Sequence, residues 1–147
     1  MIRVIRQDEV DKVAKFGKRF FIEGELPGKL KRSVFRTNWS ILINSGTGVI
    51  FGAFDNERLV GVLGGLQYKD LNDGALVATE TFWFMDKEYR KSLLGIRLFN
   101  EFEKWANHIG ACRIIMGHLN HLLSNKLENF YNKKGYVSFE THYVKEV

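Results

Sequence analysis

The segment FWFMDKEYRKSLLGIRLFNEF, residues 82–102, joins two different patterns through a polar turn. Its start belongs to a run of β-branched and aromatic residues, which predicts a strand over residues 75–85. After the turn, large apolar residues recur at intervals of three and four, which predicts a helix over residues 91–110. We therefore expect a strand–turn–helix unit. The recurring residues are Leu94, Leu98, Phe102, Trp105 and Ile109.

The turn of this unit has the features of an anion-binding site. The first backbone N–H groups of a helix have no partner within the helix, and together with the helix dipole they bind phosphate groups. Gly95 allows a ligand or a neighbouring strand to approach closely, and Arg90 or Lys91 adds positive charge. A purely structural turn between a strand and a helix also needs polar residues, so this segment alone leaves both interpretations open.

The rest of the chain alternates between the two periodicities in an order that indicates an α+β fold. We expect an α/β/α sandwich in which about four helices cover a mixed, mostly antiparallel sheet of about seven strands. The glycines of LVGVLGG, residues 59–65, lie within a predicted strand, where they indicate a bulge or close packing rather than a dinucleotide site. The further predicted helices cover residues 9–21, 31–44 and 125–134, and the further strands cover residues 2–5, 48–55, 59–69, 113–117, 137–139 and 143–147.

Length and composition exclude several classes of protein. A chain of 147 residues without repeats or linkers is expected to be a single domain over residues 1–147. Cys112 is the only cysteine, which excludes a disulfide or a cysteine-based zinc site within the chain, and we expect it in the core. No apolar run is long enough to cross a membrane, and the N-terminus lacks the apolar core of a signal peptide. These features predict a cytoplasmic protein without a membrane partner.

The net charge of +5 gives a weaker indication about partners. A positively charged protein attracts anions, which favours an anionic ligand or an acidic partner. The lysines and arginines are dispersed rather than gathered in a basic arm, so a nucleic acid is not expected as a partner.

Glu80 is a carboxylate within an otherwise apolar strand. Strict alternation would place it on one face with Phe82 and Phe84, and would place Trp83 and Met85 on the other face. A carboxylate in apolar surroundings tends to have a raised pKa, which suits a general base. A position near the exposed end of the strand, or a pairing with a lysine, would explain the residue equally well.

Two motifs resemble those of the GNAT superfamily of N-acetyltransferases. The acyl-CoA-binding motif of that family is R/Q-x-x-G-x-G/A after a strand that ends in hydrophobic-x-P-x-Y/h-R. Here Tyr89, Arg90 and Gly95 match it, whereas Lys87 replaces the proline and Leu93 replaces the first glycine. The sequence ENFYNKKGY, residues 128–136, is similar to the family's FYxKxGF/Y element. The two motifs occur in the family's order with one predicted strand between them.

The resemblance implies a fold and an acyl donor. In such proteins the strands corresponding to residues 75–85 and 113–117 splay apart, and the pantetheine of acetyl-CoA lies between them. The resemblance places the pantetheine against the backbone of Phe84 and Met85, and it implies no metal. The pyrophosphate would lie against the residues at the start of the helix, which are Arg90, Lys91, Ser92, Leu93, Leu94, Gly95 and Ile96.

The resemblance also implies a reaction in which an acetyl group moves directly to a primary amine. Glu80 lies where some members of the family keep the general base, and Tyr131 matches the tyrosine that protonates the leaving thiolate in many members. Packing as a core aromatic residue would also explain Tyr131. Arg36, Trp39 and residues 24–31 lie where the family binds its variable acceptors.

The sequence leaves several interpretations open. His118 and His121 have a spacing that could bind a metal on a helix, but no carboxylate or cysteine cluster accompanies them, so a structural or substrate-facing role is favoured. Because Lys87 and Leu93 depart from the motif, a GNAT-fold protein without catalysis, acting as a binding or structural protein in a phage or mobile element, is the alternative. The acceptor is not identified, and either a monomer or a homodimer fits.

Overall fold

A five-stranded sheet in the order β1-β2-β3-β4-β5 organises the computed structural model, which describes residues 1–147. Neighbouring strands are antiparallel except β4 and β5, which are parallel. The strands are β1 (Ile2–Val4), β2 (Gly48–Asp55), β3 (Arg58–Lys69), β4 (Leu76–Met85) and β5 (Arg113–Ile115), and the helices are α1 (Val10–Glu23), α2 (Arg32–Asn44), α3 (Leu94–His108) and α4 (Ser124–Lys133), with single 3₁₀ turns at Gln7–Glu9 and Lys87–Tyr89.

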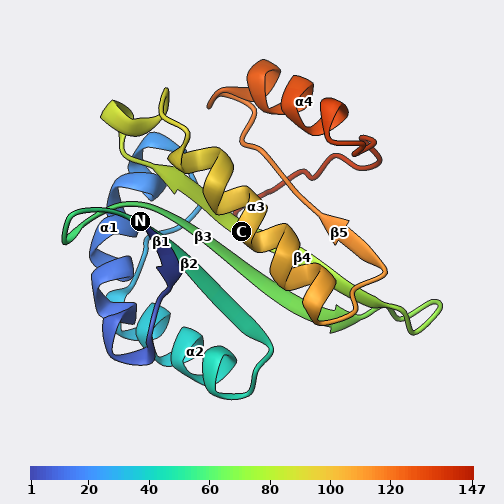
Figure 1. The fold of residues 1–147 in the computed structure, drawn as a ribbon, viewed down its shortest axis with the longest axis horizontal. Coiled ribbons are helices and arrows are strands. Elements are labelled where there is room, and N and C mark those ends of the chain that lie inside the picture. The colour runs from blue at the N-terminus through green and yellow to red at the C-terminus, as the bar shows by residue number, and fades with distance from the viewer.

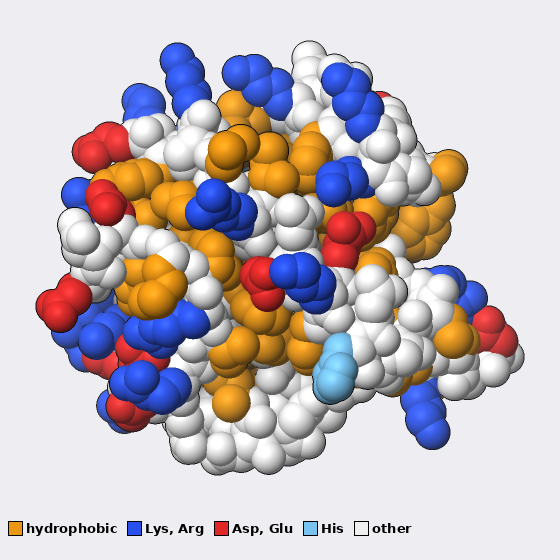
Figure 2. All heavy atoms as spheres, viewed as in Figure 1, with side chains coloured by type: hydrophobic (Ala, Val, Ile, Leu, Met, Phe, Trp, Pro, Cys, Tyr) orange, Lys and Arg blue, Asp and Glu red, His pale blue; other side chains and the backbone are white.

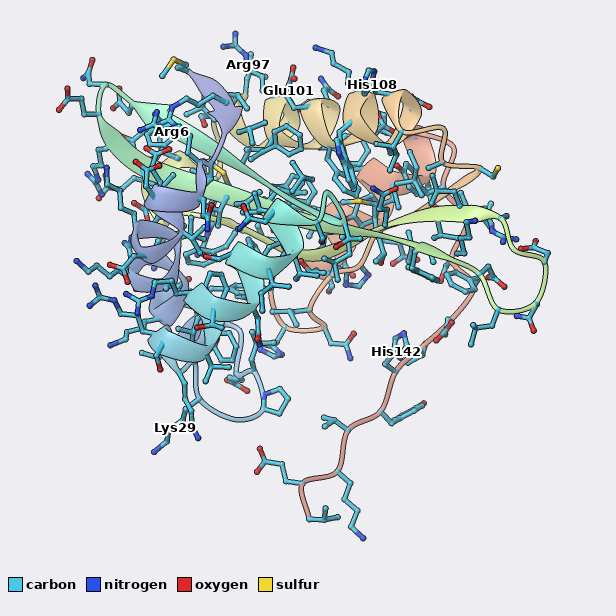
Figure 3. The ribbon with its side chains drawn as sticks, turned by 90° about the horizontal axis from the view of Figure 1, so that it is seen from below. Arg6, Lys29, Arg97, Glu101, His108 and His142 are labelled. Carbon is cyan, nitrogen blue, oxygen red and sulfur yellow. The ribbon has the colours of Figure 1, made fainter.

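The helices form layers on the two faces of the sheet (Figures 1 and 3). Helices α1 and α2 cover one face, where Val13 and Trp39 pack with Phe84 of β4. Helix α3 crosses the other face, and Leu98 and Phe102 on its inner side are fully buried there. The apolar spacing that predicted α3 therefore marks its buried side, while Arg97, Glu101 and His108 point away from the sheet (Figure 3).

Strands β4 and β5 pair over only three residues. The pairs run from Val77 with Arg113 to Thr79 with Ile115, after which β4 continues to Met85 without a partner on β5. The two strands therefore separate in the direction of the α3 N-terminus, as the family resemblance implies. Helix α4 lies beyond this opening (Figure 1), and its Phe130 packs against Phe99 of α3 with ring centroids 4.9 Å apart.

A β-bulge in β4 changes the face on which Glu80 lies. Glu80 pairs with Gly65 and Phe82 pairs with Gly64, so Thr81 is the extra residue. A Cβ on Gly65 would lie 2.2 Å from the Phe102 ring of α3, which shows that this register position faces α3. Strict alternation therefore fails at this bulge: Phe82 and Phe84 face α1 and α2, whereas Glu80 lies on the α3 face. The bulge and the close packing expected from the glycines of β3 are both confirmed.

The two strands predicted after Tyr136 are not present, so the sheet has five strands instead of about seven. Residues 137–139 and 143–147 form no ladder with a neighbouring strand, and Val137, Phe139 and Tyr143 are mostly exposed. Their alternating side chains suit a strand, but a strand is stable only when its backbone has a partner. The segment extends away from the sheet, as the position of His142 shows (Figure 3). Near its end, the Glu146 side chain accepts a hydrogen bond from the Gly28 N–H (3.1 Å).

Cys112 is exposed rather than buried in the core, because it precedes β5 at the open margin of the sheet. None of the helices is long and apolar enough to span a membrane.

The close contact at the bulge predicts that Gly65→Ala destabilises the protein. Its Cβ would force the Phe102 ring out of place, and such overpacking costs about 1–3 kcal/mol of unfolding free energy. Gly95→Ala is the matched control, since its Cβ would lie at an ordinary 3.7 Å from Met85. Urea denaturation of the two variants measures the difference, and a Gly65→Ala variant as stable as the wild type would contradict the packing described.

Candidate active site

A cavity of about 510 Å³ occupies the opening between β4 and β5. It reaches both faces of the sheet, because Phe20 of α1 lines it on one side and Ile96 of α3 lines it on the other. Most of its wall is apolar, and Figure 2 shows hydrophobic side chains gathered between the start of α3 and α4, with lysine and arginine side chains around them. Such a cavity with a few polar groups is the usual form of a small-molecule site.

The N-terminus of α3 forms one end of this cavity. The backbone N–H groups of Gly95 and Ile96 have no hydrogen-bond partner, whereas the Leu94 N–H is capped by the Ser92 hydroxyl at 3.3 Å. Lys91 lines the same end and is exposed. Two free donors at the positive end of a helix beside a lysine form an anion-binding arrangement.

Leu93 occupies the position of the missing motif glycine without backbone strain. Its φ of −71° and ψ of −6° are right-handed helical values that any residue adopts. Its side chain is 65% exposed at the edge of the cavity. The turn therefore does not depend on glycine at this position.

The structure places the residues predicted for the donor around this cavity, with one exception. Leu94 packs against the core on the inner side of α3 and does not line the cavity. The other eight residues predicted for the donor do line it: Phe84, Met85, Arg90, Lys91, Ser92, Leu93, Gly95 and Ile96.

Arg90 connects the turn to the end of β4 and to α1. Its Nε donates to the Met85 carbonyl oxygen at 3.0 Å, and its guanidinium pairs with Glu23 of α1. The guanidinium also lies over the Phe84 ring, 5.3 Å from its centroid. Because these contacts occupy Arg90, Lys91 is the cation of this turn that remains available to a ligand.

Asp86 also holds this turn in place, although no pattern in the sequence predicted a role for it. Its side chain is buried and lies between Arg19 at 2.7 Å and Arg58 at 3.1 Å, while its N–H donates to the Val60 carbonyl oxygen. A buried carboxylate needs such partners because its desolvation is costly. The only signal in the sequence is an acidic residue directly after an apolar strand, and its arginine partners are far away in the chain.

Glu80 lies on the wall of the cavity where the two strands separate. Its Oε2 accepts a hydrogen bond from the Gly117 N–H at 3.1 Å, and no cation pairs with it. Burial raises the pKa of Glu80 to about 7, against a smaller opposing effect of the hydrogen bond. A carboxylate with this pKa can accept a proton near neutral pH.

Tyr131 and Glu80 both form a hydrogen bond with the backbone of the same residue, Gly117. The Tyr131 hydroxyl donates to the Gly117 carbonyl oxygen at 2.8 Å, so Gly117 contacts Glu80 through its N–H and Tyr131 through its C=O. The Tyr131 ring is buried against Trp83 and is not part of the cavity wall. Burial, and secondarily the charge of Glu80, raises the Tyr131 pKa well above its usual value, so the hydroxyl stays protonated.

The segment between β5 and α4 closes the cavity on the α1 side. His121 Nε2 donates to the Gly24 carbonyl oxygen at 2.7 Å, and Leu119 lies against Gly24, where an added Cβ would come within 2.7 Å of it. His118 and Leu26 line the cavity in this region. His121 is thus held by a backbone oxygen, which fits the structural alternative of the two predicted roles.

Only some of the residues expected to contact an acceptor line the cavity. Leu26, within the expected loop of residues 24–31, lines the cavity, whereas Trp39 packs in the core against Phe82 at 5.4 Å between ring centroids. Arg36 is exposed on α2 and lies outside the cavity wall. Leu119 and Phe20 do line the cavity, and no local pattern in the sequence indicated either residue.

Comparisons with solved structures show the same fold in acetyltransferases. A structure described as a "predicted acetyltransferase with acetyl-CoA" from Clostridium acetobutylicum superposes with a TM-score of 0.82 at 10% identity, covering 99% of this chain and 95% of that chain. An aminoglycoside acetyltransferase from an uncultured soil metagenomic sample gives a TM-score of 0.79 at 13% identity, covering 100% and 95%. A transcriptional regulator from Bacillus halodurans gives 0.81 at 14% identity, covering 100% and 99%. Comparison with curated protein sequences finds no significant match.

Comparison with family models identifies the chain directly. The model of the acetyltransferase (GNAT) family matches residues 15–136, which include the strand–turn–helix unit, the separation of β4 from β5 and both motifs. The chain belongs to the acetyltransferase (GNAT) family.

Proposed function

We propose that the protein transfers an acetyl group from acetyl-CoA directly to a primary amine. The observation that carries this proposal is the arrangement within one cavity: free helix N–H groups at one end, and a carboxylate with a pKa near 7 where β4 and β5 separate. The first feature suits the phosphates of the donor, and the second suits removal of a proton from the acceptor. Membership of the GNAT family supports both assignments.

The donor would bind along the open part of β4 and the start of α3. The backbone of Phe84 and Met85 lies where β4 has no partner on β5, so this open edge of β4 can hydrogen-bond the amides of pantetheine. The N–H groups of Gly95 and Ile96 would hold the pyrophosphate, and Lys91 would add charge. Ser92 and Leu93 border this position, while Arg90 keeps the turn in place.

Glu80 is the proposed general base. An alkylamine is mostly protonated at neutral pH and must lose a proton before it attacks the thioester carbon. Glu80 would accept that proton, directly or through a water molecule. The new N–C bond then forms as the C–S bond breaks, and the sulfur leaves as a thiolate that takes up a proton.

Tyr131 is the proposed donor of that proton. Its raised pKa keeps the hydroxyl neutral and able to donate. In this structure the proton is directed to the Gly117 carbonyl oxygen, so donation to the sulfur requires the hydroxyl to turn away from Gly117. The same hydrogen bond positions the residue whose N–H contacts Glu80.

The first prediction from this proposal concerns donor binding, which also separates an enzyme from a GNAT-fold interaction protein. We expect isothermal titration with acetyl-CoA to show saturable binding that Lys91→Glu weakens about tenfold or more, since a charge-assisted contact contributes about 1.5–3 kcal/mol. Lys87→Glu is the matched control, because Lys87 is also exposed in this turn but lies outside the cavity wall. Absence of binding at millimolar acetyl-CoA would contradict the proposed function and favour the interaction protein.

The second prediction concerns the base. Glu80 accepts a proton only when it is ionised, so kcat/KM is expected to rise with pH through a pKa of about 7. Glu80→Gln is expected to remove this dependence and lower kcat/KM by about 10²–10⁴-fold. Ionisation of the amine affects both enzymes equally, so only the difference between their profiles is assigned to Glu80. Glu128→Gln, an exposed carboxylate on α4, is the control, and an unchanged profile in Glu80→Gln would contradict the assignment.

The third prediction concerns Tyr131. Tyr131→Phe is expected to lower kcat about tenfold or more, because proton donation to the thiolate is lost, with little change in the Kd of acetyl-CoA. Tyr136→Phe is the matched control, since Tyr136 packs against Tyr131 but donates to Glu103 at 3.0 Å. Steady-state rates and titration measure the two effects, and equal turnover in Tyr131→Phe and the wild type would remove the proton-donor role.

A further inference from the structure

The α1 side of the cavity is lined by apolar side chains from two segments far apart in sequence. Phe20 and Leu26 come from α1 and the loop after it, and Leu119 comes from the β5–α4 segment. Phe20 packs on Phe84 of β4 with ring centroids 5.2 Å apart, and Leu119 is seated against Gly24. These side chains are fixed by packing, so an acceptor that approaches Glu80 from this side meets a largely preformed apolar wall.

The charges around the same cavity are unevenly distributed. Glu80 is the only acidic residue in its wall, whereas Arg90, Lys91 and Lys126 all line it. Glu23 lies nearby but is paired with Arg90, and neither Glu23 nor Glu25 belongs to the wall. A ligand with several positive charges would have a single carboxylate as its partner and would be repelled by the unpaired Lys91 and Lys126.

We infer that the acceptor is a primary amine carried on an apolar group and without a second positive charge; this inference rests on the proposed function. The apolar group contacts Phe20, Leu26 and Leu119, and the single amine reaches Glu80. Burial of the group favours binding by roughly 25 cal/mol per Å² of apolar surface removed from water. A polycation loses this contribution and also loses hydration of its extra ammonium groups without gaining partners.

The acceptor inferred for this chain differs from the acceptors of some proteins that share its fold. Two of the matched structures are aminoglycoside acetyltransferases, at 13% and 16% identity. Aminoglycosides are polycations, so their recognition requires several acidic groups. The cavity described here offers one, and fold similarity at such identities carries no information about the acceptor.

The test compares acceptors on the full chain. Release of CoA thiol from acetyl-CoA is measured with 2-phenylethylamine and hexylamine as apolar monoamines, and with spermidine and kanamycin as polycations. We expect kcat/KM to be at least about tenfold higher for the two monoamines. A higher kcat/KM for either polycation would overturn the inference.

Substitutions in the apolar wall test whether this wall causes the preference for apolar monoamines. Leu119→Asp places a second carboxylate beside the acceptor position and is expected to shift the ratio of kcat/KM for 2-phenylethylamine to that for spermidine about tenfold towards spermidine. Leu26→Asp tests the same wall from the other segment if Leu119→Asp fails to fold, which circular dichroism reports. Ile22→Asp is the matched control, because Ile22 is 78% exposed on α1 and outside the cavity wall. An unchanged ratio in a folded wall variant would overturn the inference.

The outcomes also separate this inference from the proposed function. Absence of acetyl-CoA binding would overturn both. Saturable acetyl-CoA binding with turnover of spermidine or kanamycin, but not of the monoamines, would overturn only the acceptor class. Binding of acetyl-CoA without turnover of any of the four amines would likewise count against the acceptor class and leave the donor site in place.

Discussion

The separation of β4 from β5 after Thr79 is the constraint on which the site depends. Only three residue pairs join these strands, and beyond them the backbone of β4 has an open edge. Gly117 continues the line of β5 and is held by Glu80 on one side and Tyr131 on the other. The opening is therefore bounded by hydrogen bonds at its narrow end, and it widens towards the N-terminus of α3.

Electrostatic contacts keep the wide end of the opening in place. Asp86 is buried between Arg19 and Arg58, and Arg90 joins the end of β4 to Glu23 of α1. Both clusters tie the turn before α3 to α1, which lies on the opposite face of the sheet. A consequence is that the turn can present free N–H groups and Lys91 to a ligand while Asp86 and Arg90 are paired within the protein.

Patterns confined to a short stretch of chain were predicted well. The apolar spacing around Leu98 and Phe102 located α3, and the glycines of β3 correctly indicated a bulge and close packing. The predictions of two further strands and of the face on which Glu80 lies depended on distant partners and were wrong. Residues 137–147 have the alternation of strands but no neighbour to pair with, and Glu80 lies on the α3 face because the bulge at Thr81 interrupts the alternation of β4.

The sequence by itself determined the element order up to α4, the strand–turn–helix unit and the family, because each depends on periodicity or on residues close together in the chain. Only the tertiary structure decided that Arg90 braces the turn, that Asp86 is buried between two arginines, and that Gly117 connects Glu80 with Tyr131. It also decided that Phe20, Leu26 and Leu119 share one wall. Such contacts join residues from separate elements, and their energies depend on burial, which no local pattern contains.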